Sequence, residues 1–213
     1  MYKTGIETKQ NIIDCSKKLF HEQGYKQTSV NAICQASDTK LGTFTYYFPK
    51  KQDLLSELYP DYMQRCVDYV DAHTEGLSLA RRHMYVVMLY YGNLYSDLRT
   101  VSFHQEVLQI ASMNVWFHNT RVLISDYSGS NAQGMDDDIY DLCVEADNAV
   151  RRELNLEFIE RGDFRPLAVK ELMHRIYTIN ARLFGIDQKL MENDLDAAYE
   201  FLQKNRRAKI SLL

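Results

Sequence analysis

Cationic, hydroxyl-bearing and aromatic side chains are concentrated in a short stretch that ends near residue 51. They alternate with apolar residues and comprise Lys40, Thr43, Thr45, Tyr46, Tyr47, Lys50 and Lys51. Lysines and hydroxyls are suited to phosphate oxygens, and short polar or aromatic groups can reach base edges in a DNA groove. We interpret the stretch as a DNA-contacting surface.

The elements expected to position these side chains are two short helices joined by a tight turn. Each helix has one apolar face at helical spacing, formed by Val30, Ile33 and Cys34 in the first and by Leu41, Phe44 and Phe48 in the second. Thr28 or Ser29 can cap the first helix, and Pro49 ends the second. Ser37 and Asp38 interrupt the pattern, and Asp tolerates the left-handed backbone of a sharp turn. This arrangement is typical of a helix-turn-helix.

Helices this short are marginal in water, so a third helix must complete their core. The segment from Ile6 to Gln23 favours a helix, and Gly24 stands where a left-handed cap would end it. Its apolar members are Ile12, Ile13, Leu19 and Phe20. Residues 1–50 are therefore expected to form a three-helix DNA-binding domain.

A longer frame of residues runs through this domain: Thr28-Ser29-Val30, Ile33, Gly42-Thr43-Phe44, Tyr46-Tyr47-Phe48 and Lys51-Gln52-Asp53-Leu54. The frame resembles the TetR family of transcriptional regulators and covers roughly the first quarter of the chain. The resemblance implies an N-terminal DNA-binding domain and a helical C-terminal domain that binds an effector and dimerises. It also implies repression that the effector relieves.

Roles for individual residues are implied by the same resemblance. The implied DNA-contacting set is Thr28, Lys40, Leu41, Thr43, Thr45, Tyr46, Tyr47 and Lys51. In this set, Thr28 and Lys51 would contact phosphates. Tyr46 and Tyr47 would brace the DNA backbone or a base edge, and the other members would face the groove.

Three positions depart from the family pattern. Asp38 stands where the family usually turns on Gly, Leu41 where a basic residue is common, and Thr45 where Tyr is frequent. Leu41 could read a thymine methyl by apolar contact, or it could pack inward with Phe48. The operator sequence therefore does not follow from the family pattern.

The net charge is unevenly distributed along the chain. The 213 residues carry a formal charge of -4, yet residues 1–55 hold eight lysines against five acidic residues, giving +3 and leaving -7 for the remainder. A phosphate responds to the local balance, so the N-terminal segment is compatible with DNA.

The cysteines and the apolar runs indicate the class of protein. The cysteines are scattered, without a CxxC pair: Cys15, Cys34, Cys66 and Cys143. This spacing argues against a disulfide scaffold and a structural zinc site. No apolar run reaches the length of a membrane span, and the N-terminus lacks a signal-peptide core. We expect a cytoplasmic protein without membrane contact, metal or cofactor.

Beyond residue 51 the pattern stays helical to the end, which predicts an all-α fold with a larger second domain at residues 51–213. The expected helices are 52–73, 78–96, 98–112, 115–127, 136–161, 167–184 and 187–205. The first would connect the two domains, with a kink at Pro60. The polar stretch 128–138 is expected to be a loop.

Aromatic and Met side chains are abundant between residues 85 and 127. They are interpreted either as a helical core or as the lining of an effector pocket in which Tyr hydroxyls and a histidine orient a ligand. The candidate pocket residues are Met88, Tyr91, Tyr95, Phe103, His104, Met113, Trp116 and Phe117.

A dimer is expected because one short recognition helix reads too few base pairs to specify a genomic site. The candidate interface is the last pair of helices, and its apolar members are Leu172, Ile176, Ile179, Leu183, Leu195, Tyr199 and Leu202. These residues could instead pack within one chain.

Enzyme signatures are sparse. Glu171 and His174 form one Glu-x-x-His step, but a carboxylate-bridged metal site needs a second step, which the sequence lacks. There is no nucleophile elbow and no phosphate-cradling glycine loop.

The sequence favours a non-enzymatic regulator that binds an inverted-repeat operator in double-stranded DNA, represses, and is released by a small-molecule effector. The alternative is a helix-turn-helix protein whose C-terminal domain binds a protein partner.

Overall fold

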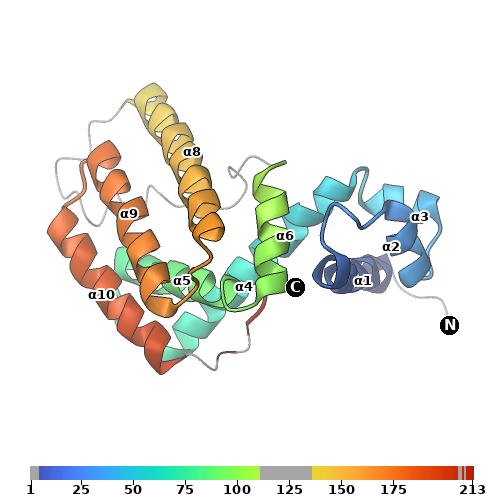
Figure 1. Cartoon of the computed structure of the whole chain (residues 1–213), viewed down its shortest axis with the longest axis horizontal. Helices are drawn as coiled ribbons and strands as arrows, with labels where there is room; N and C mark the ends of the chain where they lie inside the picture. The colour runs from blue at the N-terminus through green and yellow to red at the C-terminus, as the bar shows by residue number, and fades with distance from the viewer. Residues whose placement is uncertain (1–4, 111–135, 206–207, 209) are drawn as a thin grey trace.

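The computed structural model describes residues 5–110, 136–205, 208 and 210–213. All regular elements in these residues are helical, which confirms the predicted all-α fold. They are α1 (Gly5–Gln23), α2 (Val30–Ala36), α3 (Leu41–Tyr47), the 3-10 helix η1 (Lys51–Leu54), α4 (Leu55–His73), α5 (Leu79–Leu94), α6 (Leu98–Leu108), α8 (Asp137–Arg161), α9 (Pro166–Phe184) and α10 (Gln188–Lys204). Helices α1 to α3 lie at one end of the molecule, and α5 and α8 to α10 lie at the other (Figure 1).

The N-terminal three-helix unit forms as the sequence predicts. Ser29 caps α2, because its side chain accepts a hydrogen bond from the amide of Ala32. Asp38 adopts a left-handed conformation with φ of 50°, and Gly24 ends α1 with φ of 84°. The Asn11 side chain donates to the carbonyl oxygen of Ser37 at 2.7 Å, which fixes the turn between α2 and α3 against α1.

The helix that connects the two domains differs from the prediction at its start. The predicted helix 52–73 is divided into η1 and α4, and α4 continues past Pro60 to His73. The Asp53 carboxylate accepts a hydrogen bond from the amide of Lys50 at 2.7 Å, so it satisfies a donor where the chain enters η1. Leu54, Leu55 and Leu58 are buried, which anchors both segments in one continuous core.

The C-terminal helices pack in two neighbouring pairs, α8 with α9 and α5 with α10 (Figure 1). Gly92 permits the second pair to approach closely, since a Cβ atom at this position would lie 2.6 Å from a methyl carbon of Leu202. The described ends of these helices fall within two residues of the predicted ones. The expected helix 115–127 lies outside the described residues, as does the expected loop up to residue 135. The last two residues of the expected loop, Asp137 and Asp138, instead begin α8.

Candidate nucleic-acid interface

Helix α3 is held by its apolar face and presents its polar face outward. Phe44 and Phe48 are each 1% exposed and their ring centroids lie 5.8 Å apart. By contrast, Leu41 at the start of the helix is 54% exposed and Tyr46 is 80% exposed. Leu41 therefore points outward rather than packing inward with Phe48, which leaves it available for apolar contact with a thymine methyl.

The remaining polar residues of α3 are more constrained. The Thr45 hydroxyl donates to the carbonyl oxygen of Leu41 at 3.0 Å, so this exposed side chain presents its methyl group and oxygen lone pairs rather than its proton. The Tyr46 and Tyr47 rings meet edge to face, with centroids 4.9 Å apart. Tyr47 is half-buried, as is Thr43, and Lys40 is exposed. The exposed Tyr46 ring therefore rests against a half-buried one.

Lys51 holds the chain that leads into α2. Its ammonium group donates to the carbonyl oxygens of Tyr25 at 2.7 Å and Thr28 at 2.8 Å, and it lies 4.1 Å from the centroid of the Tyr25 ring. Partial burial lowers the pKa of Lys51, and the Glu106 carboxylate opposes this shift. Because an ammonium has three N–H donors, one remains for a phosphate.

Thr28 does not fit the predicted phosphate contact. Its side chain is fully buried, and its hydroxyl donates to the carbonyl oxygen of Gly24 at 2.7 Å while accepting from Gln23. A side chain in this position cannot reach a phosphate without leaving the fold. Thr28 instead fixes the turn whose carbonyl oxygen anchors Lys51.

Helix α6 connects this surface to the C-terminal domain. The Phe103 ring of α6 stacks on Phe20 of α1 at 5.3 Å and approaches Tyr25 at 6.2 Å. The Glu106 carboxylate accepts a hydrogen bond from the amide of Lys26 at 2.8 Å. Lys51 also packs on the Tyr25 ring, so α6 and the helix-turn-helix share one turn at residues 24–28. Sequence reasoning missed Glu106 because its partner is a backbone amide 80 residues away.

Comparison with known proteins agrees with this geometry. A model described as "Bacterial regulatory proteins, tetR family" matches residues 12–58, which include α2, α3 and Lys51. The similarity to the TetR family therefore rests on this N-terminal segment.

Two curated relatives match about a quarter of the chain. The HTH-type transcriptional regulator AcrR of Shigella flexneri is 38% identical over 53 residues, which are 25% of this chain and 25% of that protein. The probable HTH-type transcriptional regulator YttP of Bacillus subtilis (strain 168) is 34% identical over 61 residues, which are 27% of this chain and 30% of that protein. The chain thus matches less than a third of the length of either relative.

Solved structures resemble the chain over more of its length, at low sequence identity. Salmonella enterica GusR is 19% identical with a TM-score of 0.45, and the match covers 84% of this chain and 94% of that one. The fatty acid degradation regulator FadR from Bacillus halodurans is 19% identical with a TM-score of 0.46, covering 87% of this chain and 97% of that one.

The described residues of the predicted effector pocket form packed core. Met88, Tyr91, Tyr95, Phe103 and His104 are each at most 1% exposed. Tyr95 donates to Asn155 of α8, and the Tyr59 hydroxyl lies 2.9 Å from Nδ1 of His104. The core interpretation therefore holds for these five residues in this structure. Met113, Trp116 and Phe117 lie outside the described residues.

The sequence did not reveal a buried ion pair within α8. Arg151 and Asp147 are 2% and 3% exposed, and Nε of Arg151 lies 2.7 Å from the Asp147 carboxylate. Arg151 also donates to Asn180 of α9 at 3.1 Å and lies 5.0 Å from the Tyr177 ring centroid. In the sequence this pair resembles an ordinary surface pair four residues apart on a helix. Only the packing of α8 reveals its burial.

The predicted dimer residues divide into two groups. Leu172, Ile176, Leu195 and Leu202 are at most 4% exposed within a single chain, because α9 and α10 pack against each other and against α5. Within a single chain these four have almost no surface left for a partner, which agrees with the alternative that they pack within one chain. The other three predicted residues are half-buried: Ile179, Leu183 and Tyr199.

The described residues do not meet the requirements for a metal-binding cluster or for a membrane-spanning helix. No group of three or more His, Cys, Asp and Glu side chains there is arranged to hold a metal ion. His174 of the single Glu-x-x-His step lies 3.4 Å from Asp196 of α10. Among the described helices, none combines the length and apolar character needed to cross a bilayer.

Proposed function

We propose that the chain is a cytoplasmic, sequence-specific transcriptional repressor that binds an inverted-repeat operator as a homodimer and is released by a small-molecule effector. The observation that carries this proposal is the α3 surface, where Leu41 and Tyr46 are exposed while Phe44 and Phe48 fix the helix from behind. An exposed Leu and Tyr on a short, firmly packed helix are suited to the major groove.

In the proposed complex, α3 enters the major groove and Lys40, Leu41, Thr43, Thr45 and Tyr46 face the bases. Tyr47 supports the Tyr46 ring, as their edge-to-face contact suggests. Lys51 contributes its third N–H to a phosphate while its other two hold residues 25 and 28. Thr28 acts by positioning Lys51 rather than by touching DNA.

The homodimer supplies the second half-site. Two copies of α3 related by two-fold symmetry would read sites about 34 to 36 Å apart, or a multiple of this distance. Ile179 and Leu183 of α9 remain accessible for the contact. Leu183→Glu should therefore shift the protein toward monomer in sedimentation experiments and weaken operator binding. Leu79→Glu, at a residue that is 58% exposed on α5, is the matched control and should leave both unchanged.

Release by an effector requires a route from the C-terminal domain to α3. The shared turn at residues 24–28 offers one, because Glu106 of α6 holds the Lys26 amide and Phe103 packs on both Phe20 and Tyr25. A displacement of α6 would shift this turn and, through Lys51, the start of η1. The two recognition helices would then lose register with their half-sites. Linkage requires DNA to weaken effector binding by the same factor by which the effector weakens DNA binding. This factor corresponds to a coupling free energy of about 1 to 3 kcal/mol.

The test of this proposal combines selection and competition. DNA bound by the purified protein is selected from a randomised library, and its affinity is measured by fluorescence anisotropy for wild type and Glu106→Ala. Enrichment of an inverted repeat, with altered coupling in the variant, supports the proposal. Absence of any enriched sequence contradicts the DNA-reading role. Equal effector affinity with and without operator contradicts the release mechanism alone.

A further inference from the structure

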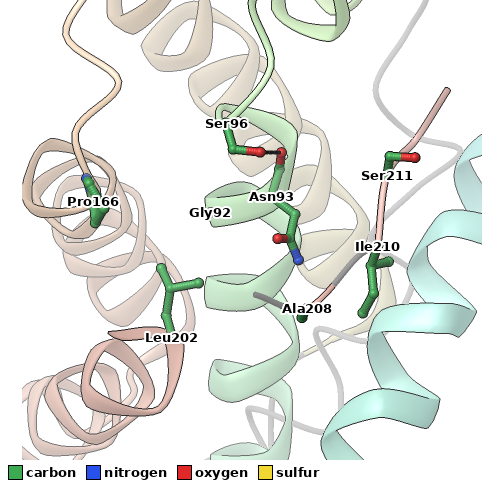
Figure 2. A pocket seen from close by; sticks show the side chains of 8 residues that line it. All are labelled: Gly92, Asn93, Ser96, Pro166, Leu202, Ala208, Ile210 and Ser211. Carbon is green, nitrogen blue, oxygen red and sulfur yellow. Dashed lines mark hydrogen bonds between the residues drawn. The ribbon is translucent and has the colours of Figure 1, made fainter. Parts of the chain in front are cut away.

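A cavity of about 380 Å³ lies where the end of α5 meets the start of α9, the end of α10 and the residues Ala208, Ile210 and Ser211. Its lining residues are Gly92, Asn93, Ser96, Pro166, Leu202, Ala208, Ile210 and Ser211 (Figure 2). None of them belongs to the aromatic group predicted to bind an effector. The volume falls within the range of small-molecule sites, about 300 to 1,000 Å³.

The lining is uncharged and of mixed polarity. Leu202, Ile210 and Pro166 supply apolar surface, while Asn93 and Ser96 supply an amide and a hydroxyl at the end of α5 (Figure 2). The Ser96 hydroxyl donates to the carbonyl oxygen of Asn93 at 2.7 Å. The side-chain nitrogen of Asn93 is buried and has no hydrogen-bond partner among the described residues. A buried donor of this kind favours a ligand that carries an acceptor.

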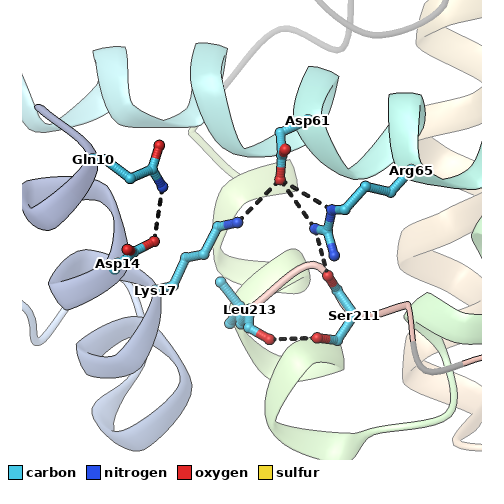
Figure 3. A network of polar contacts seen from close by, with 7 residues as sticks. All are labelled: Gln10, Asp14, Lys17, Asp61, Arg65, Ser211 and Leu213. Atoms are coloured by element: carbon cyan, nitrogen blue, oxygen red, sulfur yellow. Dashed lines mark hydrogen bonds and ion pairs between the residues drawn. The ribbon is translucent and has the colours of Figure 1, made fainter. Parts of the chain in front are cut away.

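One wall of the cavity is tied to the junction of the two domains. The carbonyl oxygen of Ser211, the residue directly before the fully buried Leu212, accepts a hydrogen bond from Arg65 of α4 at 2.8 Å (Figure 3). Arg65 pairs with Asp61, and the same carboxylate oxygen pairs with Lys17 of α1 at 3.1 Å. Each of these exposed contacts is weak by itself. Together they connect the cavity wall to the DNA-binding domain.

We propose that this cavity binds a small, neutral, largely apolar molecule that carries one hydrogen-bond acceptor, and that occupancy changes operator affinity through the Ser211, Arg65, Asp61 and Lys17 contacts. Neutrality follows from the uncharged lining, because a buried ionic ligand would have no counter-charge there. The regulatory part rests on the proposed DNA-binding function. The binding part does not.

Binding is tested without DNA on the full chain, with acetophenone and benzyl alcohol as neutral probes and benzoate and benzylamine as charged probes of similar size. Two-dimensional amide NMR should show saturable shifts at residues 92–96 and 211 with the neutral probes only. Ser96→Trp, which fills the cavity from an exposed position, should abolish these shifts. Leu98→Trp, at a 70% exposed residue outside the lining, is the control and should retain them.

Other outcomes of the binding test overturn the proposal. These are no shift with any probe, equal shifts with the charged probes, or shifts that survive Ser96→Trp. If Ser96→Trp does not fold, Ala208→Trp fills the same cavity from the opposite wall and is judged by the same criteria.

The link to DNA is tested separately by operator affinity. A saturating neutral probe should change the operator Kd of wild type by about fivefold or more. Arg65→Ala should bind the probe as wild type does while losing this change. A probe that binds the cavity and leaves the wild-type Kd unaltered overturns the regulatory part. A wild-type protein that fails to bind any DNA would instead refute the proposed function and leave the ligand site standing.

Discussion

Two pairs of consecutive tyrosines, Tyr46-Tyr47 in α3 and Tyr90-Tyr91 in α5, differ in their exposure to solvent. Both pairs place their rings edge to face, with centroids 4.9 Å and 5.2 Å apart. Tyr46 is 80% exposed, whereas Tyr90 and Tyr91 are at most 1% exposed. Helix α3 packs on one side only, while α5 is covered by α4, α9 and α10. Aromatic content alone therefore does not mark a binding surface, since the packing around a helix decides which rings can meet a ligand.

The largest expected effect concerns the buried side of this comparison. Arg151→Ala should destabilise the protein by about 3 to 5 kcal/mol, because it leaves the Asp147 charge buried without its partner. Urea denaturation measures the loss. The double variant Asp147→Leu/Arg151→Met should recover most of it, since two apolar groups need no pairing. A single variant as stable as wild type would show that the ion pair is solvated and would undermine the comparison.

Acid should lower the free energy of unfolding through a second buried group, His104. Burial lowers the pKa of His104 from 6.5 to about 3, so the folded state keeps this imidazole neutral while the unfolded chain protonates it. Stability is therefore lost as pH falls from about 6.5 toward 3. Between pH 7 and pH 5 the loss assigned to His104 is about 2 kcal/mol.

The measurement for this pH effect is urea denaturation of wild type and His104→Gln at both pH values. Wild type should lose about 2 kcal/mol more than the variant, because only wild type carries the depressed imidazole. Parallel losses in the two proteins would mean that His104 is protonated in the folded state.

Substitution of the exposed tyrosine should affect DNA binding rather than stability. Tyr46→Ala should weaken operator binding by about 1 to 2 kcal/mol, while changing the free energy of unfolding by less than about 0.5 kcal/mol. Tyr90→Ala is the matched control and should destabilise the fold strongly, since its ring is buried. Anisotropy titrations and urea melts on both variants give the two quantities. Loss of stability in Tyr46→Ala would remove the distinction between the two pairs.

The smallest expected effect concerns Lys51, which holds the turn at residues 25–28 and is proposed to contact a phosphate. Lys51→Met should weaken binding to all DNA sequences alike and reduce the slope of log K against log salt by about one unit, since one phosphate contact is lost. Lys50→Met, at an exposed neighbour, is the control for general charge loss. Anisotropy at several salt concentrations gives both slopes. An unchanged slope with a lower melting temperature would assign Lys51 to the Tyr25 and Thr28 turn alone.

The sequence predicted local structure well wherever the deciding interactions were short in range. The cap at Ser29, one of the two residues expected to provide it, the left-handed turn at Asp38 and the apolar faces of the first three helices follow from residue type and spacing within a few positions. These features are enough to place Leu41 and Tyr46 on one helix. They do not decide whether Leu41 faces outward, because that depends on where α1 and α2 pack.

Long-range contacts explain what the sequence did not predict. Thr28 matches the family frame, yet it is buried and its hydroxyl donates a hydrogen bond to the carbonyl oxygen of Gly24. Arg151 and Asp147 follow a surface-like pattern, yet α5 and α9 cover them. The Leu172 and Leu195 faces suit either a dimer or a single chain, and only the packing of α9 on α10 distinguishes the two.

The measurement that most directly tests the central claim is selection from a randomised DNA library with wild type and with Tyr46→Ala. The account predicts that wild type enriches an inverted repeat whose half-site centres lie about one helical turn, or a multiple of it, apart. The variant should enrich the same repeat weakly or not at all. Enrichment of an identical repeat to an identical extent by both proteins would contradict the claim that the exposed face of α3 reads DNA.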